Sequence, residues 1–96
     1  MLKEPCVYIL ASRKNGTLYT GVTSNLQVRV RQHKEKVQPG FTSTHDVHRL
    51  VWFETHDSMD SAILREKQLK AGSRQKKLNL VHQLNPDWSD LYFTLF

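Results

Sequence analysis

Five polar side chains in this sequence stand where the local pattern calls for aliphatic residues. They are two tyrosines, one arginine, one histidine and one glutamate: Tyr8, Tyr19, Arg29, His33 and Glu66. A carboxylate can hold a hard divalent cation and leave positions for water and a phosphate oxygen. An arginine can bind a phosphate, and a tyrosine can orient or deprotonate water once a cation lowers its pKa from about 10. This set therefore suits phosphodiester hydrolysis.

Two β-prone runs, residues 6–11 and 17–22, carry the two tyrosines. The Asn-Gly pair at residues 15–16 between them is the strongest short-range signal for a β-hairpin. We expect a two-residue turn that pairs Lys14 with Thr17. The register of this turn decides which side chains share a face of the sheet.

In that register the side chains of four hairpin residues share one face of the sheet: Tyr8, Leu10, Tyr19 and Gly21. The opposite face is aliphatic and suits a core, whereas this face joins two phenols to a glycine that another group can approach closely. Alternatively, both tyrosines are ordinary amphipathic strand residues with their hydroxyls at the rim. A one-residue bulge in the turn would send the tyrosines to opposite faces.

Patterning beyond the hairpin predicts three helices and a third strand. Ser24 and Gln27 have the spacing of a capping box at the start of the first helix. The expected order is a helix at about 25–36, a loop at 41–48, a strand at 50–54, a helix capped by residues 57–58 that runs to about 71, and a helix at about 74–84.

Arg29 and His33 fall on or beside the inward stripe of the first helix, which Leu26 and Val30 define. A guanidinium near a buried edge is costly unless an anion meets it, which favours a phosphate site. Alternatively, both side chains snorkel, with their stems on the core edge and their heads in water.

Glu66 occupies an inward position of the second helix, between Ala62 and Leu69. A carboxylate at a buried edge is usually paired or binds a metal ion. The alternative to a metal site is an ion pair, for which the sequence offers Arg65, Lys70 or Arg29.

Composition places the chain among soluble single domains. The 96 residues contain 39% hydrophobic and 24% charged residues, and no apolar run approaches the roughly 18 residues that span a bilayer. Residues 1–5 lack the apolar core of a signal peptide, and the single cysteine, Cys6, has no internal disulfide partner. We therefore expect one domain, residues 1–96, in the cytoplasm. The net charge of +5 favours a polyanionic partner.

The order and spacing of these residues resemble the GIY-YIG nuclease domain. Its two signature triplets correspond to CVY at residues 6–8 and YTG at 19–21. The segments GTLYTGVTSNLQVRVRQHK, LVWFE, AILREKQLK and LNPDWSDL are similar to those of the small bacterial group in which this domain stands alone. The resemblance covers most of the chain, although Cys6 replaces the first glycine and Thr20 the isoleucine of the second triplet.

The resemblance implies an α+β fold with a small three-stranded antiparallel sheet flanked by three helices. It also implies metal-dependent cleavage of DNA, with Mg²⁺ or Mn²⁺ as a single divalent ion. By resemblance, Tyr8 and Tyr19 are the signature tyrosines, Arg29 binds phosphate, His33 lies near the scissile phosphate and Glu66 binds the metal. Which tyrosine is the general base stays open. Gly21 joins the site, as does an asparagine, either Asn79 or Asn85, of which we favour Asn85.

The resemblance gives the basic residues a use, as contacts to phosphates that flank the cut. They are Arg31, Lys34, Lys36, Lys67, Lys70, Arg74 and Lys77. His45 and His48 are interpreted as loop residues near substrate. With residues 5–84 as the core, the apolar segment 85–96 either packs back on it or forms a homodimer contact.

The expected activity is that of a DNA endonuclease in repair or processing, with RNA not excluded as a substrate. The main alternative is a DNA- or RNA-binding module that keeps the nuclease fold with little turnover. Glu66 argues against this alternative, because its charge opposes a phosphate unless a cation intervenes.

Overall fold

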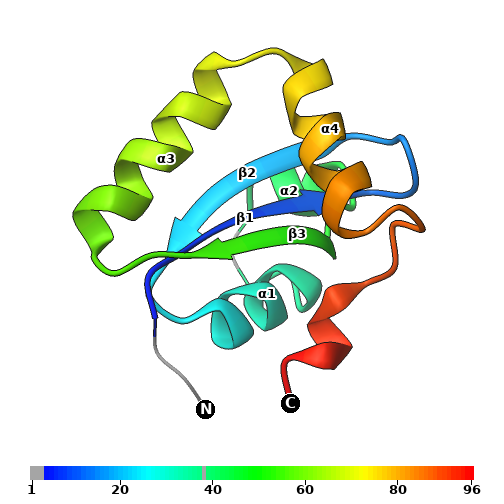
Figure 1. The fold of residues 1–96 in the computed structure, drawn as a ribbon. Coiled ribbons are helices and arrows are strands. Elements are labelled where there is room, and N and C mark those ends of the chain that lie inside the picture. The colour runs from blue at the N-terminus through cyan, green and yellow to red at the C-terminus, as the bar shows by residue number, and fades with distance from the viewer. Residues whose placement is uncertain (1–3, 38) are drawn as a thin grey trace.

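The computed structural model describes residues 4–37 and 39–96, which form a three-stranded antiparallel sheet with helices on both faces (Figure 1). The fold has the expected α+β class. The expected domain, residues 1–96, contains residues 1–3 and 38, which lie outside the described part. Residues 1–3 also belong to the N-terminal segment, residues 1–5, that lacks the apolar core of a signal peptide. The strands are β1 (Cys6–Ala11), β2 (Leu18–Thr23) and β3 (Arg49–Thr55), in the order β2-β1-β3; the helices are α1 (Leu26–Lys34), α2 (Phe41–Thr44), α3 (Met59–Ala71), α4 (Arg74–Leu84) and the short 3₁₀ helix η1 (Leu91–Thr94).

Six residues, 12–17, connect β1 and β2, and the first and last of them pair, so the predicted two-residue turn is wrong. Ser12, and not Lys14, faces Thr17, whose carbonyl accepts the Ser12 N–H at 3.0 Å. Asn15 takes a left-handed conformation with φ of 59°. Asparagine tolerates this conformation because its short polar side chain bonds locally.

The change of register is two residues, which preserves the alternation of side chains along each strand. Tyr8 now pairs with Gly21, and Leu10 with Tyr19. The two tyrosines therefore share one face of the sheet, as expected, although the turn that was expected to place them there does not form.

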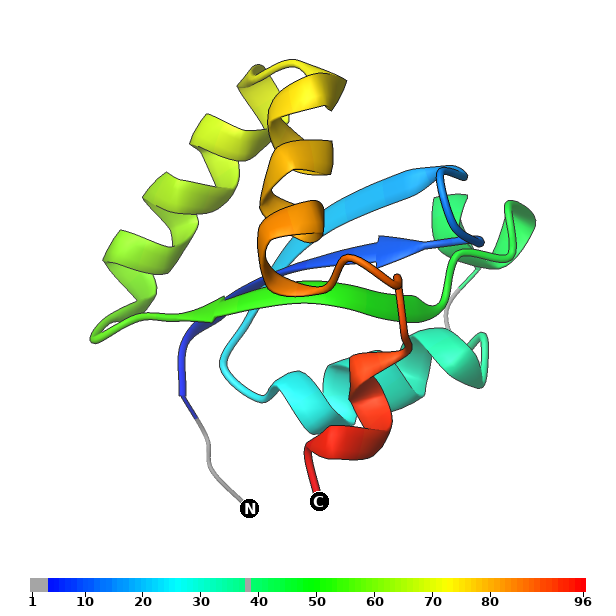
Figure 2. The ribbon, with the colours of Figure 1, turned by 45° about the vertical axis from the view of Figure 1, so that its right-hand side comes forward.

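Each face of the sheet has its own core, as the turned view in Figure 2 makes plain. The face of Val7 and Ile9 packs under α3 and α4, and the face of Tyr8 and Leu10 packs on α1 and η1. Because β1 is the central strand, its side chains are fully buried on both faces. The sheet therefore lies between two layers of helices.

The helices begin at polar caps that satisfy their first free N–H groups. Asn25 caps α1, so the predicted capping box of Ser24 and Gln27 does not form, while Ser58 and Ser73 cap α3 and α4. The segment 41–44 forms the one-turn helix α2 where we expected a loop. None of the described helices is long and apolar enough to cross a membrane.

The C-terminal segment packs back on both cores. Trp88 is completely buried and packs in one core with residues of α4 and the sheet, and Tyr92 is 9% exposed on the opposite core. Phe93 and Phe96 stay exposed. A homodimer contact through this segment stays a prediction.

Candidate active site

Tyr8 lies at the centre of a polar cluster beside the edge strand β2. Although it belongs to the central strand, its ring lies across Gly21 on β2, and the side chain is 1% exposed. A Cβ atom at position 21 would lie 2.5 Å from both Cζ and Oη of Tyr8. Only glycine leaves room for the phenol to pass over β2 toward the edge of the sheet.

His33 of α1 holds the hydroxyl of Tyr8. Its Nε2 lies 3.0 Å from Tyr8 Oη, and its Nδ1 lies 3.0 Å from Oγ1 of Thr42 on α2. Burial, assisted by the positive charge of Arg29, lowers the pKa of His33 to about 4. The ring is therefore neutral at pH 7 and bonded at both nitrogens, which contradicts the alternative that it snorkels into water.

Charged groups from two helices act on the same phenol. Burial, with smaller contributions from the neighbouring Tyr19 and Glu66, raises the pKa of Tyr8 to about 12, although the Arg29 guanidinium acts in the opposite direction. Arg29 comes from α1 below the sheet, whereas Glu66 comes from α3 above it (Figure 1). The structure thus brings all five candidate residues of the sequence analysis to one edge of the sheet.

Arg29, His33 and Tyr19 line a pocket of about 130 Å³ that α2 closes on one side. Nη1 of Arg29 donates to Gln32 one turn later at 3.3 Å. A guanidinium beside a neutral imidazole and a phenol suits a phosphate oxygen, because its planar donors match that geometry.

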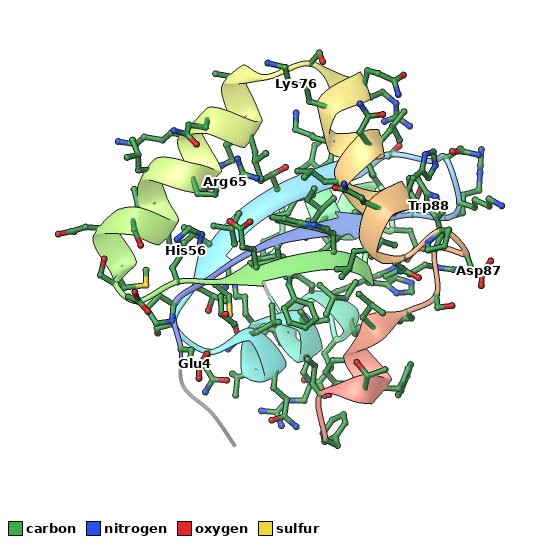
Figure 3. All side chains as sticks on the ribbon, viewed as in Figure 1. Glu4, His56, Arg65, Lys76, Asp87 and Trp88 are labelled. Carbon is green, nitrogen blue, oxygen red and sulfur yellow. The ribbon has the colours of Figure 1, made fainter. Side chains whose placement is uncertain are left out.

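Glu66 keeps its carboxylate at the edge of the site, with a side chain that is 15% exposed. Of its three expected ion-pair partners, Lys70 is the one in contact, with Nζ 3.3 Å from the carboxylate. Arg65 instead donates to Glu54 on β3 at 3.1 Å, and Glu54 also holds His56 (Figure 3).

The donor set fits one hard divalent cation. Among the described residues no group of three His, Cys, Asp or Glu gathers as a complete metal site. Mg²⁺ does not need one, because it is usually bound through one or two carboxylates and keeps waters and substrate phosphate oxygens. A single carboxylate such as that of Glu66 could therefore hold the ion together with waters and substrate oxygens.

The predicted phosphate-contact residues lie in three different surroundings. Lys70, Arg74 and Lys77 line a groove of about 410 Å³ beside Tyr19 and Phe41. Lys34 instead bonds Asp90 and lies over the rings of Tyr92 and Phe93, which ties α1 to the C-terminal segment. The remaining predicted phosphate contacts, Arg31, Lys36 and Lys67, are exposed.

Asn85 has a structural role at the end of α4, and the structure does not bring it into the cluster. Its amide donates one hydrogen bond to the carbonyl of Val51 at 3.2 Å and another to that of Ser89 at 2.8 Å. Both N–H donors are therefore used within the fold. The Val51 carbonyl needs this partner because β3 has a bulge there, which interrupts the ladder with β1.

Two residues of the site were missed in the sequence analysis. Thr42 orients His33, and Phe41 borders both the pocket and the groove. Phe41 and His45 have i, i+4 spacing, which is a helical signal within residues 41–48.

Gly21→Ala is expected to lower the free energy of unfolding by about 1–3 kcal/mol and to reduce any activity of the site strongly. The added methyl group collides with the buried ring of Tyr8 and moves its hydroxyl from His33. Urea unfolding and an activity assay measure the two effects. Unchanged stability and activity would contradict the geometry.

His33 is expected to make stability fall as the pH drops from about 6.5 to about 4. Its pKa in the folded chain, about 4, is below the ordinary 6.5. The unfolded chain therefore binds the proton first, and wild type loses roughly 1–3 kcal/mol after allowance for partial exposure. The free energy of unfolding, measured with urea across this pH range, should depend less steeply on pH for His33→Gln than for wild type. Equal pH dependence in both proteins would contradict the lowered pKa of His33 in the folded chain.

Comparisons with known proteins agree on one family. Residues 4–79 match the GIY-YIG catalytic domain. A UPF0213 protein of Syntrophus aciditrophicus is 39% identical over 82 residues, which cover 84% of this chain and 92% of that protein. A UPF0213 protein of Staphylococcus haemolyticus is 35% identical, with coverage of 80% and 93%. The solution NMR structure of a UPF0213 protein from Bacillus halodurans is similar, with a TM-score of 0.56, 30% identity and coverage of 91% and 92%.

Proposed function

Because this chain belongs to the GIY-YIG catalytic domain family, a nuclease family, we propose that it is a divalent-metal-dependent endonuclease that hydrolyses DNA phosphodiester bonds. One observation carries the proposal: the Tyr8 hydroxyl bonds to a neutral histidine while Arg29 and Glu66 both act on it. A phenol so placed can exchange a proton with water, beside groups that hold a phosphate and a cation.

The proton path runs from water through Tyr8 to His33. When the neutral ring carries its proton on Nδ1 and donates it to Thr42, Nε2 accepts the hydroxyl proton of Tyr8. Tyr8 then takes a proton from the attacking water as its own moves to His33. The water oxygen forms the new bond to phosphorus as the bond to the leaving oxygen breaks. The leaving oxygen then takes a proton from solvent, and His33, whose pKa is about 4, releases its proton to solvent. This assigns the general base to Tyr8 rather than to Tyr19.

Arg29 and Glu66 have complementary roles on the phosphate. Arg29 lines the pocket and stabilises the negative charge that develops on the phosphate oxygens. Glu66 would hold the divalent ion, Mg²⁺ or Mn²⁺, which would supply Lewis-acid polarisation of the phosphate. The tyrosine with the raised pKa needs both positive charges in order to act as a base near neutral pH.

The proposal is tested by incubating plasmid, branched DNA, single-stranded DNA and RNA with the protein and Mg²⁺, Mn²⁺ or EDTA. We expect nicking of DNA that requires the divalent ion and that Arg29→Ala abolishes. Arg13→Ala is the matched control, because Arg13 is an exposed guanidinium in the β1–β2 loop. Cleavage of RNA alone would assign the site to a ribonuclease.

Binding without cleavage would overturn the proposal. If wild type cuts none of these substrates with either metal but binds DNA with a steep salt dependence, the chain is a binding module. The biological setting, DNA repair or processing, is part of the proposal and is tested by the sensitivity of a deletion strain to DNA damage.

A further inference from the structure

Phe41 is an exposed aromatic residue beside the candidate active site. Its side chain is 48% exposed, and none of the four residues of α2 is buried. The ring therefore contributes little to either core. An aromatic residue exposed at this place calls for another explanation, because large apolar side chains at a polar site often mark a binding surface.

His45 supports the ring of Phe41 from one side. The two rings stack with centroids 4.3 Å apart and planes 21° apart. Nδ1 of His45 donates to the carbonyl of Phe41 at 3.0 Å, which fixes the imidazole under the phenyl ring. The ring of Tyr19 also stacks near Phe41, with centroids 6.3 Å apart and planes 27° apart. Phe41 and His45 are thus oriented before any ligand arrives, and a ligand can reach the exposed part of their rings. We call these two residues the Phe41–His45 platform.

The platform stands between the two places that would hold a nucleic-acid backbone. Phe41 lines the pocket of Arg29 and His33, and it also lines the groove of Lys70, Arg74 and Lys77. A strand that runs from the pocket into this basic groove has its bases within reach of the ring. In a duplex those bases are paired and stacked on one another, so only an unpaired base can lie on Phe41.

The platform is also joined to the proton path. Thr42, the next residue, bonds Nδ1 of His33, whose Nε2 bonds Tyr8. A base that stacks on Phe41 therefore contacts α2, the helix whose Thr42 orients the catalytic imidazole. This links recognition of the nucleotide to the position of the reacting groups.

We propose that the Phe41–His45 platform stacks an unpaired nucleobase next to the scissile phosphate. This inference rests on the proposed function and names its substrate class: DNA with a single-stranded nucleotide at the cut, in preference to intact duplex. Stacking is tolerant of sequence, because every base presents a π-face.

Binding tests the platform without cleavage, in protein that carries Glu66→Gln. A short single-stranded DNA with 2-aminopurine reports stacking by fluorescence quenching, and a duplex of the same sequence is the comparison. We expect Phe41→Ala to weaken single-strand binding about tenfold and to remove the quenching, while duplex binding is unchanged. Phe41→Trp should preserve both, and His45→Ala should weaken binding less. Phe96→Ala, an exposed phenylalanine at the C-terminus, is the matched control.

Two results would overturn the platform: single-strand binding by Phe41→Ala that equals the parent, or a Trp variant that is as weak as the Ala variant. Circular dichroism confirms that the variants fold. The proposed function is judged apart from this. Loss of quenching in Phe41→Ala supports the platform even if wild type cleaves nothing, and cleavage by wild type supports the function even if quenching never changes.

Discussion

Tyr8→Phe is expected to lower kcat for DNA cleavage by about 10²–10⁴-fold, the usual contribution of a positioned acid or base. The substitution removes the hydroxyl that bonds His33 and keeps the ring that fills the space over Gly21. The fold and DNA binding should therefore change little. Single-turnover cleavage and a separate binding titration measure the two effects.

Tyr19→Phe is the matched control for this prediction. The ring of Tyr19 packs 5.5 Å from that of His33 and 6.3 Å from that of Phe41, and the substitution keeps both contacts. We expect it to lose less than about tenfold in kcat. A larger loss for Tyr19→Phe than for Tyr8→Phe would reverse the assignment of the general base.

Glu66→Gln is expected to abolish metal-dependent cleavage, with a loss of at least about 10³-fold. The amide has nearly the shape of the carboxylate but no charge to hold a divalent ion. Because the side chain is only paired with Lys70, stability should change by less than about 1 kcal/mol. Cleavage measured across a Mn²⁺ titration distinguishes a weakened metal site from a lost one.

Glu54→Gln is the carboxylate control for Glu66. Glu54 is also near α3, but Arg65 and His56 both bond it on β3, away from the cluster. Its amide variant should cleave within a few-fold of wild type. Full activity of Glu66→Gln, or equal losses in both variants, would contradict the role of Glu66.

Much of the site could be predicted because it follows from periodicity. Alternation along strands places Tyr8, Tyr19 and Gly21 on one face in any register that differs by two residues, so an error in the turn did no harm. Helical spacing likewise places Arg29 and His33 on one face of α1. These are local rules that need no knowledge of distant contacts.

The sequence was less informative where the role of a residue depends on a contact with a residue far away in the chain. Lys34 has the sequence of a surface lysine, but Asp90, 56 residues later, binds it. Asn85 has the sequence of an active-site amide, but the bulge in β3 leaves a carbonyl that it must satisfy. Ser24 and Asn25 both have side chains that can cap a helix, and the backbone conformation determines that Asn25 is the cap of α1.

The passage of Tyr8 over Gly21 also has a consequence for how activity responds to denaturant. Arg29 and His33 belong to α1 below the sheet and Glu66 to α3 above it, and Arg29 and Glu66 both act on Tyr8 beside the edge strand β2. Detachment of either layer separates the reacting groups, although the rest of the sheet stays paired. Catalysis should therefore disappear at a lower urea concentration than the far-ultraviolet signal of the fold, which makes cleavage a sensitive probe of partial unfolding.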